Sequence, residues 1–118
     1  MYPSRPGLLM GFHGCEKSVR DSIVSGTSML KASENGYDWL GAGFYFWENN
    51  YERALEFAQN PPGKKKFKVP SVLGAVIVEG DELYPGAGFH DKNHIQICIR
   101  NPNCIKGFFI PREEVQWN

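Results

Sequence analysis

The segment that most restricts the fold is residues 71–80, which read SVLGAVIVEG. Its apolar side chains, many of them β-branched, would lie on both faces of a strand. A strand that is apolar on both faces belongs inside a sheet that is covered on both sides. The chain therefore has to supply strands that pair with this one and other elements that cover it.

Four more stretches have the pattern of strands, and two have the pattern of short helices. The strands are expected at residues 8–14, 44–47, 94–102 and 104–111. The helices are expected at residues 16–26 and 48–60, and the Pro and Gly residues of 82–93 indicate a loop. Gly26 can end the first helix, and Asn49 or Asn50 can cap the second. With 13 glycines and 8 prolines available for turns, the pattern predicts an α+β or mainly β fold.

Length and charge limit the class of protein. At 118 residues the chain is expected to form a single domain, residues 1–118. Its 13 basic and 13 acidic side chains cancel, so no net charge draws it to nucleic acid or to a membrane. Three cysteines without paired spacing indicate reduced thiols, and no apolar run is long enough for a signal peptide or a membrane span. We therefore expect a cytoplasmic protein that does not enter a membrane.

His13 and Gly14 end the first predicted strand. A histidine in such a place is more often a structural residue than a ligand-binding one, by roughly two to one. Gly14 shifts this balance slightly, because a residue without a side chain lets a ligand approach the backbone N–H and C=O.

Tyr45 and Gln96 are two further candidates. Gly41 and Gly43 precede Tyr45, whose ring could stack on a planar heterocycle or simply pack in the core. Gln96 lies in an alternating strand, on the face that also carries Cys98 and Arg100, and the opposite face carries Ile95, Ile97 and Ile99. That polar face fits either solvent or the floor of a cleft.

A metal site is not expected. His90, His94 and Cys98 are spaced by four residues and would align on a helix, but the surrounding period of two predicts a strand. On a strand, His94 and Cys98 would lie roughly 13 Å apart, too far to bind one ion. The basic run KKKFK at residues 64–68 reads as a solvated loop, although it could meet the phosphates of a dinucleotide or an RNA.

The candidate residues together resemble one enzyme family. FHG at residues 12–14 and GAGFYFW at residues 41–47 resemble the paired motifs of the ADP-ribosyltransferases of the diphtheria-toxin and poly-ADP-ribose polymerase type. That family carries a His-Gly on its first core strand and a Gly-x-Gly-[Ile/Val/Phe]-Tyr-Phe segment on a later one. A helix with an inward alanine follows, as Ala54 does here, and the strand of Gln96 resembles the strand with the family's third motif, a carboxylate. The resemblance extends over residues 11–109.

The resemblance implies a fold and a cofactor. The fold would consist of two packed, mainly antiparallel β-sheets with a few short helices, and NAD⁺ would bind between the sheets as the substrate. His13 would bind the adenosine-side ribose, and the Gly14 backbone would bind the nicotinamide amide. Tyr45 would stack on the nicotinamide ring, and Gly43 would let this strand bend against the ligand.

The third motif and the second stacking residue depart from the family pattern. Gln96 takes the place of the carboxylate; it can accept a hydrogen bond from the ribose, but it has no charge and is no general base. The position of the family's second stacking tyrosine falls near Glu56, and Phe57 is one residue further on. The segment between residues 68–80 and residues 82–88 is also short for the family, so a strand or helix could be missing and a homodimer could compensate for it.

Three functions follow from these observations. The first is NAD-dependent transfer of ADP-ribose to a protein or nucleic-acid acceptor, as in bacterial or phage-related toxins, with an antitoxin as a partner. The second is a non-catalytic module of the same fold that binds NAD⁺ or ADP-ribose. The third is a structural domain whose aromatic side chains all lie in the core.

Overall fold

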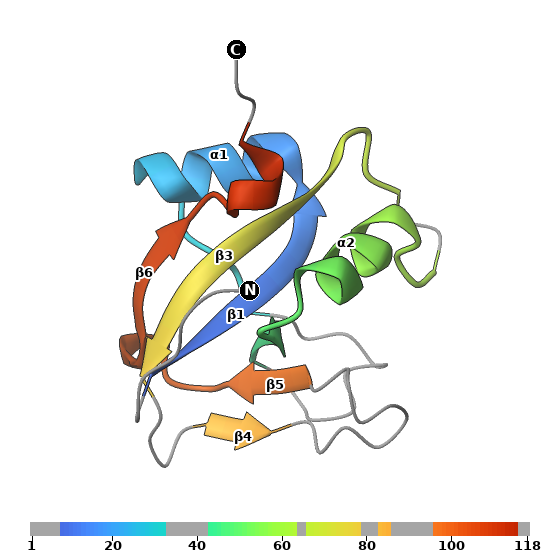
Figure 1. Cartoon of the computed structure of the whole chain (residues 1–118). Coiled ribbons are helices and arrows are strands. Elements are labelled where there is room, and N and C mark those ends of the chain that lie inside the picture. The colour runs from blue at the N-terminus through green and yellow to red at the C-terminus, as the bar shows by residue number, and fades with distance from the viewer. Residues whose placement is uncertain (1–7, 33–42, 64–65, 79–82, 86–95, 116–118) are drawn as a thin grey trace.

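The structure is a computed structural model, and it describes residues 8–32, 43–63, 66–78, 83–85 and 96–115. The described residues form an α+β fold, as predicted (Figure 1). The elements are, in chain order, β1 (Leu8–Glu16), α1 (Lys17–Ser25), β2 (Phe44–Glu48), α2 (Tyr51–Gln59), β3 (Pro70–Val78), β4 (Leu83–Pro85), β5 (Gln96–Ile99), η1 (Pro102–Cys104), β6 (Ile105–Phe109) and η2 (Arg112–Glu114).

The described strands pair antiparallel in one sheet, in the order β4-β5-β2-β1-β3-β6. β1 pairs with β3 along its whole length, but it pairs with β2 only at Gly11–Glu48 and Phe12–Trp47. We call this short contact the β1–β2 seam. Figure 1 shows β4 and β5 running crosswise to β1 and β3. The expectation of two separate packed sheets is therefore not confirmed, because the two halves of this sheet are joined at the seam.

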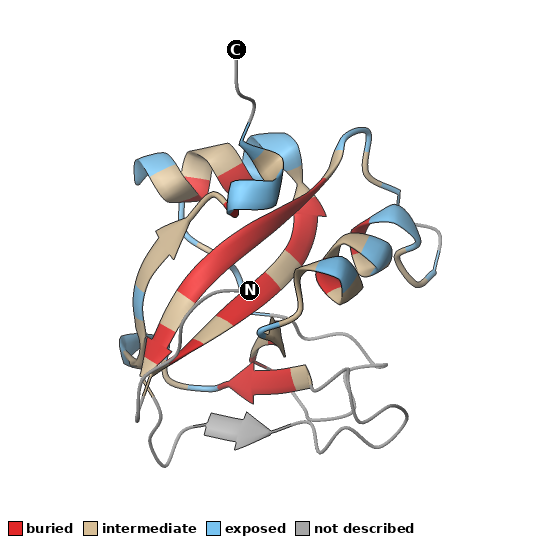
Figure 2. Cartoon of the chain, viewed as in Figure 1, coloured by how far each residue is buried: buried red, intermediate tan, exposed pale blue. Residues whose placement is uncertain are grey.

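The predicted buried strand is β3, and the structure confirms that both of its faces are covered. On one face, Leu73 packs with Ile23 of α1. On the other, Val72 packs with Phe12 and with Ala54 of α2. Figure 2 shows buried residues concentrated along β1, β3 and β5. The two short helices thus lie on opposite faces of the sheet.

The end of α1 and the start of α2 lie where the sequence predicts. Gly26 follows α1 with φ 83°, a left-handed conformation that favours glycine, and its N–H donates to the Ile23 carbonyl at 3.1 Å. Asn50 caps α2, because its side-chain oxygen accepts a hydrogen bond from the Arg53 N–H at 3.0 Å. Asn49, with φ 47°, makes the turn that leads from β2 into α2.

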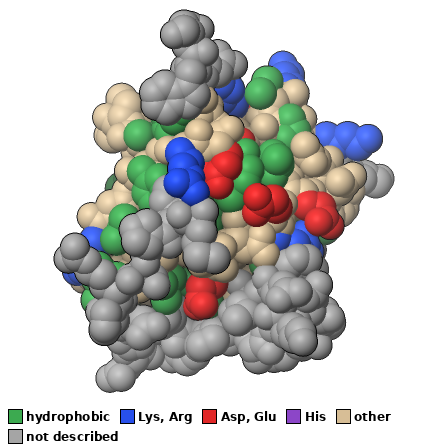
Figure 3. All heavy atoms as spheres, viewed as in Figure 1, with side chains coloured by type: hydrophobic (Ala, Val, Ile, Leu, Met, Phe, Trp, Pro, Cys, Tyr) green, Lys and Arg blue, Asp and Glu red, His purple; other side chains and the backbone are tan. Residues whose placement is uncertain are grey.

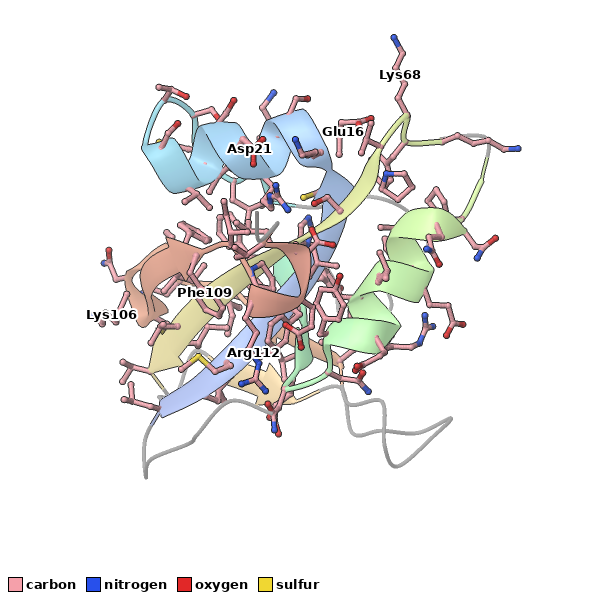
Figure 4. All side chains as sticks on the ribbon, turned by 45° about the horizontal axis from the view of Figure 1, so that its top comes forward. Glu16, Asp21, Lys68, Lys106, Phe109 and Arg112 are labelled. Atoms are coloured by element: carbon pink, nitrogen blue, oxygen red, sulfur yellow. The ribbon has the colours of Figure 1, made fainter. Side chains whose placement is uncertain are left out.

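Glu16 binds the backbone just before β3 begins. Its carboxylate accepts hydrogen bonds from the backbone N–H groups of Lys68 and Val69, both at 2.7 Å, and Figure 4 shows Glu16 and Lys68 near each other there. These bonds lower the pKa of Glu16. Lys66 and Lys68 of the predicted basic loop are exposed, and residues 64–65 lie outside the described residues.

Two local predictions need correction. β4 lies inside residues 82–93, which the Pro and Gly content marks as a loop, because pairing with β5 holds this short segment extended. The polar face predicted for residues 94–102 is wrong at Cys98, which is 0% exposed. Gly43 packs directly on the Cys98 sulfur, so that side chain is enclosed between strands. Ile97 and Ile99 are buried as expected, and Ile95 lies outside the described residues.

Candidate functional site

The β1–β2 seam brings the two predicted motifs together. Phe12–Trp47 is the last residue pair of the seam. Beyond it, Nδ1 of the His13 ring donates a hydrogen bond to the Tyr45 carbonyl oxygen, at 2.8 Å. Because a carbonyl oxygen only accepts, the proton lies on Nδ1, and Nε2 is the acceptor nitrogen of the neutral ring.

Gly14 turns its backbone toward β2 at the seam. On the same strand, the Met10 carbonyl accepts a hydrogen bond from the Asn49 N–H at 2.7 Å, and alternate residues of a strand direct their N–H and C=O to the same side. The N–H and C=O of Gly14 therefore point toward β2, beyond the last residue pair. A Cβ at Gly14 would lie 2.5 Å from the Ala54 carbonyl of α2, so the glycine is also required for α2 to pack on β1.

Tyr45 and Gln96 lie on the sheet face that α2 covers. Gln96 pairs with Trp47 across β5 and β2, and Trp47 packs in the same cluster as Phe12 and α2. Tyr45 is two residues from Trp47, so its side chain leaves the strand on that face. Both side chains are half buried.

His13 leaves the sheet on the opposite face. Its ring centre lies 6.0 Å from that of Phe46, whose side chain belongs to the core on the α1 side. The structure thus brings His13 and Tyr45 together through a ring-to-backbone bond. It places Tyr45 and Gln96 on neighbouring strands and one face, with the His13 ring on the other side of the seam.

The remaining predicted residues are Gly43, beside β5, and Phe57, on α2. Gly43 packs against β5, where a Cβ would clash with the Cys98 sulfur. This close packing is a sufficient reason for a glycine at this position, with no need for a ligand. Phe57 is half buried in the C-terminal half of α2.

Sequence reasoning missed a contact between Trp47 and Arg53. The Cζ atom of Arg53 lies 4.2 Å from the centre of the Trp47 ring, within the range of a cation–π interaction. The Arg53 side chain is 26% exposed and forms an ion pair with Glu56, whose Oε1 is 3.8 Å from Nη1. The spacing of six residues across a strand, a turn and a helix gives no periodic signal for this contact.

A second set of polar side chains meets at Glu114 and was also missed. Oε1 of Glu114 accepts hydrogen bonds from Arg20 Nη1 at 2.6 Å, from the Val72 N–H at 2.9 Å and from Ser71 Oγ. Oε2 accepts a hydrogen bond from the Tyr51 hydroxyl at 2.6 Å. We call these five residues the Glu114 hub. It connects α1, α2 and β3 to one carboxylate.

The protonation states in the Glu114 hub follow from its contacts. Burial disfavours the charged form of Glu114, but the hydrogen bonds from Ser71, Tyr51 and Val72 and the charge of Arg20 outweigh it and lower its pKa. Burial and the bond to Glu114 raise the pKa of Tyr51. At neutral pH the hub therefore contains a carboxylate, a neutral phenol and a guanidinium, which suits a structural link between elements.

The buried Cys15 is no nucleophile. Burial raises the pKa of its thiol to about 12, although the nearby Arg20 acts in the opposite direction. Among the residues that the structure describes, no group of three or more His, Cys, Asp or Glu side chains could hold a metal ion. His90 and His94 lie outside the described residues.

Acidic and basic side chains are interspersed on the face shown in Figure 3. The helices in the described part of the chain are all too short or too polar to cross a membrane.

No family model matches the chain, and neither a curated protein nor a solved structure matches it.

Proposed function

We propose that the chain binds NAD⁺ at the β1–β2 seam and transfers ADP-ribose to a macromolecular acceptor. The observation that supports this most is the hydrogen bond from His13 Nδ1 to the Tyr45 carbonyl, just beyond the last residue pair of β1 and β2. It joins the His-Gly motif to the Gly-x-Gly-Phe-Tyr-Phe segment, although the two are far apart in the sequence. Gln96 lies on the next strand, β5.

Each side chain then has a specific role in binding. The Gly14 backbone offers a donor and an acceptor toward the seam, which matches the two ends of the nicotinamide carboxamide. The Tyr45 ring stacks on nicotinamide, and Nε2 of His13 accepts a hydrogen bond from a ribose hydroxyl. Because His13 and Tyr45 leave the sheet on opposite sides, the ligand lies along the edge of the seam and meets each from its own side.

The reaction breaks the bond between nicotinamide N1 and ribose C1′. The electron pair of this bond leaves with nicotinamide, which becomes neutral, and positive charge develops on the ribose. The amide oxygen of Gln96 accepts a hydrogen bond from the ribose 2′-hydroxyl and orients its dipole toward that charge. A nucleophile of the acceptor then bonds to C1′ and loses its proton to a base of the acceptor or to water.

Gln96 also supports a second candidate, a module that binds NAD⁺ or ADP-ribose without transfer. A neutral amide stabilises developing positive charge less than a carboxylate does. Loss of one such electrostatic contact typically lowers a rate by about 10²–10³-fold. Binding does not depend on this contact to the same degree. The antitoxin partner, the homodimer and the cytoplasmic location stay predictions under either function.

One experiment separates these functions. The protein is incubated with biotin-labelled NAD⁺ and a cell lysate, nicotinamide release and label on acid-precipitated protein or nucleic acid are measured, and NAD⁺ binding is followed by calorimetry. The variants are Tyr45→Ala, Gln96→Ala and Gln96→Glu. Lys106→Ala is the control, because Lys106 is exposed on the edge strand β6.

The outcomes are distinct. Transfer of label by the wild type that Tyr45→Ala abolishes supports the proposal, and an increase of about 10²–10³-fold in Gln96→Glu identifies Gln96 as the third-motif position. Saturable binding without release leaves the binding module. Release without labelling of any macromolecule indicates hydrolysis and overturns transfer. The absence of NAD⁺ binding overturns both functions.

A further inference from the structure

We infer that Arg53, held against Trp47, binds the diphosphate of the ligand, an inference that rests on the proposed function. The guanidinium lies 4.2 Å from the centre of the Trp47 ring. Trp47 is two residues from Tyr45 on the same sheet face, and it pairs directly with Gln96. Arg53 is therefore held on the same face as the two side chains proposed to contact nicotinamide and its ribose.

The charges on α2 single out Arg53. A dinucleotide carries two negative charges on its diphosphate, and these need a cation or donors when water is displaced. Arg53 is the one Lys or Arg in α2, whose other charged residues are Glu52 and Glu56, both exposed. Its ion pair with Glu56 is long, at 3.8 Å, and the Glu56 side chain is 64% exposed. Such a pair contributes little, so a phosphate would compete for the guanidinium with a weak partner.

The Trp47 contact prepares Arg53 for this role. A free arginine side chain samples many rotamers, and fixing it costs binding free energy. Trp47 already restricts the guanidinium to the sheet face, and a contact with the ring still leaves N–H donors for phosphate oxygens. Hydrogen bonds between a guanidinium and a phosphate are charge-assisted and can be bidentate.

The inference defines the class of ligand that the site prefers. Ligands with a diphosphate, such as NAD⁺ and ADP-ribose, gain the Arg53 contact. Nicotinamide riboside carries the same nicotinamide and ribose but no phosphate, so it does not. Arg53 thus lets the site distinguish a dinucleotide from nicotinamide riboside, which carries only the part of NAD⁺ that reacts.

The test compares these two ligands on matched variants. The dissociation constants of NAD⁺ and nicotinamide riboside are measured by calorimetry for the wild type, Arg53→Met, Arg53→Ala and Lys106→Ala. Arg53→Met keeps an unbranched stem against Trp47 and removes the charge together with the N–H donors, so it separates these from the packing of the stem. Lys106→Ala removes one positive charge from the opposite side of the fold, where Figure 4 shows Lys106 on β6, away from α2.

We expect Arg53→Met and Arg53→Ala to weaken NAD⁺ binding by about 10- to 100-fold and to leave nicotinamide riboside binding unchanged. The salt dependence of NAD⁺ binding should also become shallower in both variants. Unchanged NAD⁺ affinity in Arg53→Met, together with loss of binding in Tyr45→Ala, would overturn the role of Arg53 and leave the proposed function standing. A wild type that binds neither ligand overturns the function itself.

Discussion

The Glu114 hub makes Glu114→Gln the most informative substitution for stability. The change keeps the shape of the side chain and removes its charge. The Glu114 side chain is 11% exposed, and its main charged partner, Arg20, is 5% exposed. The substitution therefore removes a buried counter-charge without creating a cavity.

The size of the effect follows from the hydrogen bonds. Four donors, from Arg20, Tyr51, Ser71 and Val72, bond to the carboxylate. A bond to a charged group contributes about 1.5–3 kcal/mol, and a bond between neutral groups about 0.5–1.5 kcal/mol. Losing about 1 kcal/mol at each bond gives about 4 kcal/mol, and we reduce this to about 3 kcal/mol because Arg20 keeps Asp21 at 2.8 Å.

Thermal and urea unfolding measure the effect directly. For a chain of this length, 3 kcal/mol corresponds to a decrease in Tm of about 12 °C. The control is Glu113→Gln, because Glu113 is the exposed neighbour of Glu114 in the same short helix. A Glu114→Gln protein within about 0.5 kcal/mol of the wild type would refute the argument that this carboxylate holds α1, α2 and β3 together.

Three further predictions concern pH, packing and reactivity. In the folded state the pKa of Glu114 is below the ordinary 4.5. The stabilisation that its carboxylate gives the folded state is therefore present above that pH and is lost as the pH falls. The difference in unfolding free energy between wild type and Glu114→Gln should shrink below about pH 4.5. Gly14→Ala should lower the unfolding free energy by about 1–3 kcal/mol in urea titrations, since its Cβ would press on the α2 backbone, whereas Gly107→Ala, with nothing within 4 Å, should change it little. Cys15, with its pKa raised to about 12, should resist iodoacetamide at pH 8 in the folded protein and react once the chain is unfolded, as read by mass spectrometry; rapid labelling of the folded protein would contradict its burial.

The local signals in the sequence predicted most of the elements. Gly26 and Asn50 mark the end of α1 and the start of α2, and the apolar run of residues 71–80 identifies β3. β4 was missed because its three residues carry no pattern of their own and become a strand only by pairing with β5. The division of the sheet at the seam depends on how far two strands pair, which residue periodicity does not encode.

The positions of the candidate site residues relative to one another could be predicted only in part. The family resemblance suggested that His13 and Tyr45 belong together, and the structure joins them at the seam by a hydrogen bond. The sequence alone could not show that the two side chains leave the sheet on opposite faces, because this depends on the register of β1 against β2. Arg53 and Glu114 were missed because each meets its partners through the fold. For Glu114 these partners are 42 to 94 residues away.

The seam has a mechanical consequence for the molecule. Few backbone bonds cross it, but one core cluster crosses it, with Leu9 and Ile77 on one half and Phe46 and Ile97 on the other. Apolar contacts have no preferred direction, whereas hydrogen bonds do. In the part of the chain that the structure describes, β1 and β2 are joined by two residue pairs and by the bonds from Asn49 to Met10 and from His13 to Tyr45, whereas β1 pairs with β3 along its whole length. We therefore expect the two halves of the sheet to shift against each other more easily than β1 and β3 do.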